Sequence, residues 1–238
     1  MDIREKIIIA LDAGTKEEAL ALAGQLEEAR IFKVGLELFT AEGPALLEEL
    51  ARRGKKCFLD LKYHDIPNTV AGATRSAVRH GVAMLTLHVS GGGEMMRRAA
   101  EAAADEAAKV GQAKPLLLGV TVLTSLGDGN LLDIGCPSPV GDQVLTLASL
   151  AKAAGLDGVV SSPQEIEIIK RQLGKDFLVV TPGIRPAWAA AHDQKRVLTP
   201  AEAVRLGADY LVIGRPVTAA PSPSEALRRI LEEIVAGL

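Results

Sequence analysis

Eight short aliphatic segments recur along the 238-residue chain, and a segment of helical character follows each of them. The aliphatic segments are of strand length and rich in Val, Ile and Leu, which is typical of strands buried on both faces of a parallel sheet. The eight expected strands are residues 6–12, 31–36, 56–62, 84–88, 116–123, 158–161, 177–181 and 210–213. This alternation of strand and helix restricts the chain to parallel α/β folds.

The segments between these strands have the apolar spacing of helices and contain good helix formers. The expected helices are residues 16–29, 43–53, 68–80, 93–110, 140–153, 163–173, 200–206 and 224–235. A glycine stands shortly before four of the expected strands, at Gly54, Gly81, Gly155 and Gly207. The residue that ends a helix often adopts a left-handed backbone conformation, which favours glycine. Eight such units predict a (β/α)8 barrel, a TIM barrel, built as one domain by residues 1–238.

A doubly wound open sheet is the alternative fold. Its dinucleotide-binding form carries a G-x-G-x-x-G turn after the first strand. Residues 11–15, with the sequence LDAGT, lack this pattern. We also find no linker that would separate a second domain, so the barrel is preferred.

Composition narrows the classes of function. The net charge of −3, without a basic stripe interleaved with aromatic residues, argues against a nucleic-acid partner. No apolar run approaches the length of a membrane span, and the charged residues 1–6 do not resemble a signal peptide. Cys57 and Cys136 have no metal-ligand spacing and are expected to be reduced thiols. We expect a cytoplasmic protein without a membrane partner.

Charged residues occupy the end of the expected strand 56–62, which reads KCFLDLK. Strand alternation places Phe58, Asp60 and Lys62 on one face. In a strand covered on both faces, the two charged groups lose much of their hydration and each needs a partner. A buried ion pair that only joins strands is the alternative, but such pairs are often no better for stability than apolar residues. We therefore interpret these charges as functional.

The carboxyl ends of barrel strands collect the functional groups of barrel enzymes. The candidates at these ends are Asp12, Lys33, Asp60, Lys62, Asp65 and His88. Four of them, Lys33, Asp60, Lys62 and Asp65, form an array of alternating charge. In such an array an ammonium group can stabilise a carbanion and then protonate carbon. A divalent cation bound by Asp12, Asp60 and Asp65 is the alternative, although two lysines in the same cluster oppose it.

The two histidines of this region are weaker candidates. No nucleophile near His64 requires a base, so we expect His64 to be a surface or hydrogen-bonding residue. We expect His88 to support the reactive groups without joining the chemistry. Residues 91–93, three consecutive glycines, are a weak signal for a phosphate-binding helix start.

Two similar turns follow the seventh and eighth expected strands. They are TPGIRP at residues 181–186 and IGRP at residues 213–216. Barrels often bind phosphate between these two loops, where glycine admits backbone N–H groups and arginine supplies a charged fork. Arginines that cap strands or bridge to helix carboxylates are the alternative. The repeated turn favours a phosphorylated substrate.

Residues 60–69, DLKYHDIPNT, resemble the signature of the orotidine 5'-phosphate decarboxylase family. Further segments resemble those of the same family in the same order, so that the likeness covers essentially the whole chain. They are IALD at 9–12, FKVGLELF at 32–39, VTVLTS at 120–125, TPGIR at 181–185 and IGRP at 213–216.

The resemblance implies the decarboxylation of orotidine 5'-phosphate to UMP and CO2, the final step of de novo UMP synthesis, with no metal or organic cofactor. It implies that Lys62 protonates C6 of the pyrimidine, that Asp60 lies beside the departing carboxylate, and that Lys33 completes the network near the ribose. It also implies that Asp65 reaches into the neighbouring subunit's site, which requires a homodimer with shared active sites.

The substrate-binding residues implied by the resemblance come from most of the strand ends. Asp12 would bind ribose hydroxyls, and Thr69 would come from the partner subunit. Thr124 and Ser125 would meet the edge of the base. Arg185, Gly214 and Arg215 would hold the phosphate, with Gln194 as a lid residue that closes over it. The full set is Asp12, Lys33, Asp60, Ile66, Thr69, Thr124, Ser125, Arg185, Gln194, Gly214 and Arg215.

Two other functions compete with this one. Related sugar-phosphate barrels, of the metal-dependent keto-gulonate phosphate decarboxylase or hexulose phosphate synthase type, share the Asp-x-Lys-x-x-Asp core. They place a metal-binding carboxylate on strand two, where this chain has Lys33. A non-catalytic UMP sensor is the other alternative, but a sensor does not need four alternating buried charges.

Overall fold

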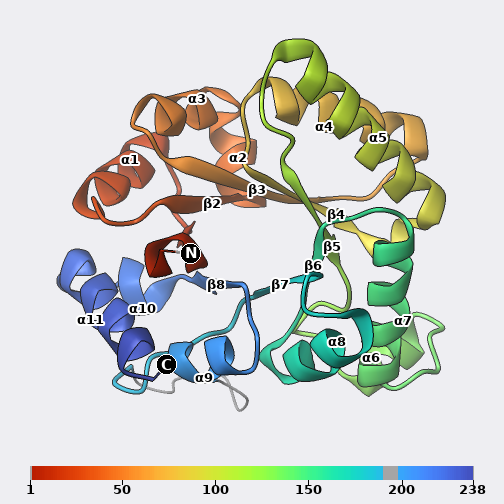
Figure 1. Cartoon of the computed structure of the whole chain (residues 1–238). Coiled ribbons are helices and arrows are strands. Elements are labelled where there is room, and N and C mark those ends of the chain that lie inside the picture. The colour runs from red at the N-terminus through yellow and green to blue at the C-terminus, as the bar shows by residue number, and fades with distance from the viewer. Residues whose placement is uncertain (1, 190–197, 238) are drawn as a thin grey trace.

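The computed structural model describes residues 2–189 and 198–237. Its strands form a closed barrel in the order β1 to β8, and every neighbouring pair is parallel (Figure 1). The strands are β1 Ile7–Leu11, β2 Ile31–Gly35, β3 Lys56–Tyr63, β4 Met84–His88, β5 Leu116–Val120, β6 Gly158–Val160, β7 Leu178–Thr181 and β8 Tyr210–Ile213. The predicted (β/α)8 barrel is confirmed.

The helices surround the ring of strands (Figure 1). They are α1 Lys16–Gln25, α2 Leu36–Glu42, α3 Ala45–Arg52, α4 Pro67–Arg79, α5 Gly93–Val110, α6 Asp128–Asp133, α7 Val140–Ala153, α8 Ile166–Leu173, α9 Pro200–Arg205, α10 Arg215–Thr218 and α11 Pro223–Ala236. Gly54, Gly81, Gly155 and Gly207 have φ values of 70°, 70°, 84° and 106°, as the helix ends predict. In the part of the chain that the structure describes, no helix has the length and apolar character of a membrane span.

The expected helix at residues 43–53 is wrong at its start. The chain turns into α2 directly after β2, and α2 ends at Glu42 because Gly43 adopts a φ of 62°. The next helix, α3, begins only after Pro44. Shorter errors concern the expected strand 116–123, which ends at Val120, and the expected helix 16–29, which ends at Gln25. The short helices α6 and α10 were not expected.

Apolar side chains fill the barrel interior below a polar layer. The interior cluster contains Ile31 of β2, Phe58 of β3 and Met84 of β4, together with residues of other strands. Side chains two residues further along a strand point to the same face. The strands therefore place Lys33, Asp60 and Thr86 above this apolar cluster, toward the carboxyl ends of the strands.

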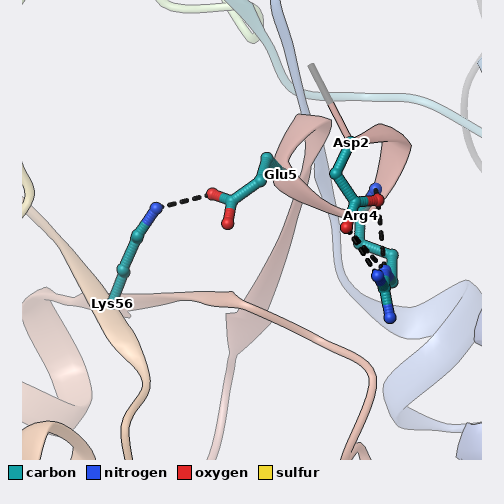
Figure 2. Close-up of polar contacts among 4 residues, drawn as sticks. All are labelled: Asp2, Arg4, Glu5 and Lys56. Atoms are coloured by element: carbon teal, nitrogen blue, oxygen red, sulfur yellow. Dashed lines mark hydrogen bonds and ion pairs between the residues drawn. The ribbon is translucent and has the colours of Figure 1, made fainter.

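A short 3-10 helix, η1 Ile3–Lys6, precedes β1 at the opposite end of the barrel. The Nζ atom of Lys56, at the start of β3, donates to the Glu5 carboxylate over 2.7 Å, and Arg4 pairs with Asp2 (Figure 2). The Lys6 Nζ atom donates to the Asp209 carbonyl ahead of β8 over 3.5 Å. The two lysine contacts join the starts of β1, β3 and β8, away from the charged array.

The close approach of β6 and β7 gives a stability prediction. A Cβ atom built on Gly158 would lie 2.3 Å from the backbone oxygen of Leu178, which cannot move without disturbing the sheet. We expect Gly158→Ala to lower the free energy of unfolding by about 1–3 kcal/mol. Gly72, on the exposed face of α4 with open space around its Cβ position, is the matched control. Gly72→Ala should raise that free energy by about 0.5–1 kcal/mol.

Urea denaturation of both variants measures the two effects. If Gly158→Ala were as stable as the unaltered chain, the packing assigned to β6 and β7 would be incorrect.

Candidate functional site

An irregularity in β3 shapes the centre of the site. Leu59 pairs with Leu85 of β4, but the next pair is Tyr63 with Leu87. Residues 60–62 of β3 therefore lie opposite one β4 residue, Thr86. Simple alternation, which the sequence analysis assumed, does not hold to the end of this strand.

Lys62 has an unusual backbone conformation within this irregularity. Its φ is 51°, and it is the only non-glycine residue with positive φ in residues 2–189 and 198–237. The left-handed conformation costs a residue with a Cβ atom about 1–2 kcal/mol. Such strain persists where the surrounding structure enforces it, and it clusters at functional sites.

Asp60 lies at the centre of the array of charges. Its Oδ1 atom accepts a hydrogen bond from Lys62 Nζ over 2.9 Å, and its Oδ2 atom lies 3.8 Å from Lys33 Nζ. The Asp60 and Lys33 side chains are 14% exposed and that of Lys62 is 28% exposed, so all three are largely removed from solvent. Lys33 Nζ also lies 3.8 Å from Asp12 Oδ1. Three members of the predicted array, Lys33, Asp60 and Lys62, thus lie together, and Asp12 lies beside them.

A small cavity of about 150 Å³ opens beside this array, at the carboxyl ends of β1 to β3. Asp12, Lys33, Asp60 and Lys62 line it together with the start of α2. The backbone comes close to two of these groups, since a Cβ atom on Gly35 would lie 3.2 Å from Lys33 Nζ, and one on Gly214 would lie 3.2 Å from Asp12 Oδ2. A larger residue at either position would crowd the charged group beside it.

Thr86 was not singled out by the sequence analysis, and it contacts two members of the array. Its hydroxyl donates to Asp60 Oδ1 over 3.0 Å and accepts the backbone N–H of Lys62 over 2.9 Å. The available signal was a hydroxyl residue in the middle of a buried strand, two positions before His88.

His88 lies at the end of β4 as predicted, and its ring centroid is 5.5 Å from that of the exposed His64. Burial lowers the pKa of His88, the nearby His64 and Lys62 lower this pKa further, and Asp60 opposes the shift. The folded protein therefore favours the neutral imidazole next to the array.

The segment after β3 carries Asp65, Ile66 and Thr69 on the surface of the molecule. The Asp65 carboxylate accepts the N–H of Ile66 over 2.6 Å, and Ile66 is 67% exposed. Among the residues that the structure describes, Asp65 forms no ion pair with Lys33 or Lys62, unlike the other members of the predicted array. A cavity of about 320 Å³ lies along this segment and is lined by Lys62, Asp65 and Thr69.

A larger cavity of about 800 Å³ lies along the loops after β5, β6 and β7. Thr124, Ser125 and Gly183 line it, which brings together the predicted base-contacting and phosphate-binding loops. Glu165 also lines this cavity and was not predicted. The Ser161 hydroxyl donates to its carboxylate over 3.1 Å, and burial raises the pKa of Glu165.

The two predicted phosphate-binding arginines are placed differently. Arg185 is half-buried after β7, and its backbone N–H donates to the carbonyl of Leu198 over 3.1 Å. Arg215 is exposed and begins α10 directly after Gly214. Gln194 lies outside the described residues. Within the described ranges, no group of three or more His, Cys, Asp or Glu residues is arranged to hold a metal ion.

Comparison with known proteins finds one family. The model of the "Orotidine 5'-phosphate decarboxylase / HUMPS family" matches residues 5–230. The chain is 51% identical over 231 residues to an orotidine 5'-phosphate decarboxylase of Nostoc sp., covering 97% of each protein. It is 52% identical over 235 residues to the enzyme of that name from Geobacter sulfurreducens, covering 98% of each.

Solved structures give the same result. The crystal structure of orotidine 5'-phosphate decarboxylase from Lactobacillus acidophilus superposes with a TM-score of 0.86 at 38% identity, covering 96% of this chain and 98% of that one. An uncharacterized conserved protein from Geobacillus kaustophilus superposes with a TM-score of 0.84 at 37% identity, covering 96% of this chain and 99% of that one.

The environment of His88 predicts a dependence of stability on pH. Its pKa is lowered in the folded protein, whereas the unfolded chain has the ordinary value of about 6.5. Between the two values the unfolded chain binds more protons, so the free energy of unfolding falls as the pH falls below about 6.5. His88→Gln should reduce this fall, because it removes the group whose pKa is lowered on folding.

Urea denaturation between about pH 5 and pH 8 measures the difference. Identical pH dependence in His88→Gln and the unaltered chain would contradict the environment assigned to His88.

Proposed function

This chain belongs to the orotidine 5'-phosphate decarboxylase / HUMPS family, and we propose that it converts orotidine 5'-phosphate to UMP and CO2 without a metal ion. The observation that carries the proposal is the array in which Asp60 lies between the ammonium groups of Lys33 and Lys62, beside a cavity at the strand ends. The curated relatives at about half identity carry the name of this enzyme.

The array supplies the chemical step. The bond between C6 of the pyrimidine and its carboxylate breaks, CO2 leaves, and the electron pair stays on C6. The Lys62 ammonium group stabilises this developing charge and transfers a proton to C6, which gives UMP and a neutral amine. Asp60 orients the ammonium group through their 2.9 Å hydrogen bond. Solvent then returns a proton to Lys62.

Binding of the remote groups of the substrate positions C6 against Lys62. In this proposal Asp12 binds the ribose near Lys33, and Thr124 and Ser125 contact the base from the large cavity. Arg185, Gly214 and Arg215 hold the phosphate, with Gln194 as the lid contact. Binding energy gained at the phosphate can then support exclusion of water and orientation at the reacting carbon.

A homodimer with shared sites is part of the proposal. Asp65, Ile66 and Thr69 would serve the neighbouring subunit, and their exposure on the surface supports this assignment. We also propose a cytoplasmic location and no nucleic-acid partner. The net charge of −3 supports the second of these points.

The sugar-phosphate reaction of the related enzymes is the second candidate. The family's description names a second group, HUMPS, besides the decarboxylases, so we consider this reaction as well. Lys33 on β2 favours the metal-free reaction, because its ammonium group lies 3.8 Å from both Asp12 and Asp60, where it would repel a divalent cation.

The purified protein should remove the ultraviolet band of orotidine 5'-phosphate, and excess EDTA should leave the rate unchanged. Lys62→Ala should lower kcat by at least about a thousandfold, since it removes both charge stabilisation and the proton donor. UMP binding, measured by calorimetry, should remain detectable. Full activity in this variant, or loss of activity in EDTA, would contradict the proposal.

The phosphate site gives a separate prediction. Arg215→Ala should raise the KM for orotidine 5'-phosphate by about 10- to 100-fold, because a charge-assisted hydrogen bond is lost. Arg228→Ala removes an exposed arginine of α11 that pairs with Glu225 and serves as the control. Unchanged kinetics in Arg215→Ala would show that the phosphate lies elsewhere.

A further inference from the structure

We propose that the Thr86 hydroxyl is a positioning group that holds the Lys62 backbone and the Asp60 carboxylate in their reactive arrangement. The proposal rests on the function proposed above and adds a residue from the neighbouring strand to it. Thr86 is fully buried in β4, and its side chain points toward residues 60–62 of β3.

The need for such a group arises from the β3 irregularity. Because residues 60–62 lie opposite Thr86 alone, the regular ladder between β3 and β4 is interrupted where Lys62 lies. The Lys62 N–H donates to the Thr86 hydroxyl oxygen, over 2.9 Å. A side chain of β4 thus accepts the hydrogen bond of a β3 backbone group and holds Lys62 at its φ of 51°.

The same hydroxyl also fixes Asp60. A hydroxyl group has one proton to donate, and that of Thr86 points to Asp60 Oδ1 over 3.0 Å. This carboxylate oxygen is also the acceptor for Lys62 Nζ, over 2.9 Å. Thr86 therefore holds Lys62 at two points. It binds the Lys62 backbone N–H directly, and it is linked to the Lys62 ammonium group through Asp60.

This arrangement has a consequence for catalysis. Without a second hydrogen-bond donor, the Asp60 carboxylate can rotate about its side-chain bonds. The Lys62 ammonium group, which is hydrogen-bonded to this carboxylate, then moves as well. Displacement of a reacting group by about 1 Å is enough to cost on the order of a hundredfold in rate. We therefore expect the Thr86 hydroxyl to affect kcat more than substrate affinity.

The test compares Thr86→Val, which keeps the branched shape and removes the hydroxyl, with Thr86→Ser, which keeps the hydroxyl. Thr86→Val should lower kcat by about 10- to 100-fold, with UMP affinity within about threefold of the unaltered protein. Thr86→Ser should remain within about threefold in kcat. Thr74→Val is the matched control, because Thr74 is equally buried and its hydroxyl has no hydrogen-bond partner among the described residues.

A second readout does not depend on turnover. Amide hydrogen exchange at Lys62, followed by NMR, should be about tenfold faster in Thr86→Val than in the unaltered protein, and near its original rate in Thr86→Ser. If Thr86→Val does not fold, Thr86→Ala and Thr86→Ser provide the same comparison, since they differ by the hydroxyl alone.

The outcomes separate this inference from the proposed function. An unaltered protein that does not decarboxylate orotidine 5'-phosphate would overturn the function, while the exchange rate at Lys62 would still test the hydrogen bond. An active protein whose kcat and exchange rate do not change in Thr86→Val would overturn the role of Thr86. Equal loss of kcat in Thr86→Ser and Thr86→Val would also overturn it, because the hydroxyl would then not be the cause.

Discussion

The carboxylate of Asp60 is the acceptor on which the arrangement of the site depends. Lys62 and Thr86 donate to one of its oxygens over 2.9 and 3.0 Å, and Lys33 lies 3.8 Å from the other. Two ammonium groups that are mostly removed from water would repel each other without it. Removal of one member of a buried ion pair leaves the other charge without a partner. This lowers the stability of the protein by more than the intact pair contributes to it.

The barrel supplies the conditions under which this array is possible. Its interior below the array is filled by side chains such as Phe58 and Met84, which fix the strands from which Asp60 and Thr86 project. The contacts of η1 join the strand starts at the other end of the barrel. One end of the barrel thus carries stabilising contacts and the other carries the charged array. The strand ends can then carry charge and a strained Lys62, because stability is provided elsewhere.

Much of this organisation was predictable from the sequence, because strand alternation and the position of charges at strand ends are local properties. They were sufficient to predict the barrel and the proximity of Asp12, Lys33, Asp60 and Lys62. The irregularity of β3 was not predictable, since it depends on how β3 pairs with β4, a contact between distant segments. For the same reason Thr86 was missed: only the observed register brings its hydroxyl to Lys62.

In the proposed function Lys62, held by Asp60, exchanges a proton with C6 of the pyrimidine. By microscopic reversibility the same group must remove the C6 proton of UMP, which needs neither CO2 nor the carboxylated substrate. The direct measurement is deuterium incorporation at C6 of UMP in D2O, followed by NMR. The unaltered protein should catalyse this exchange and Lys62→Ala should not. Equal exchange in the two proteins would contradict the account.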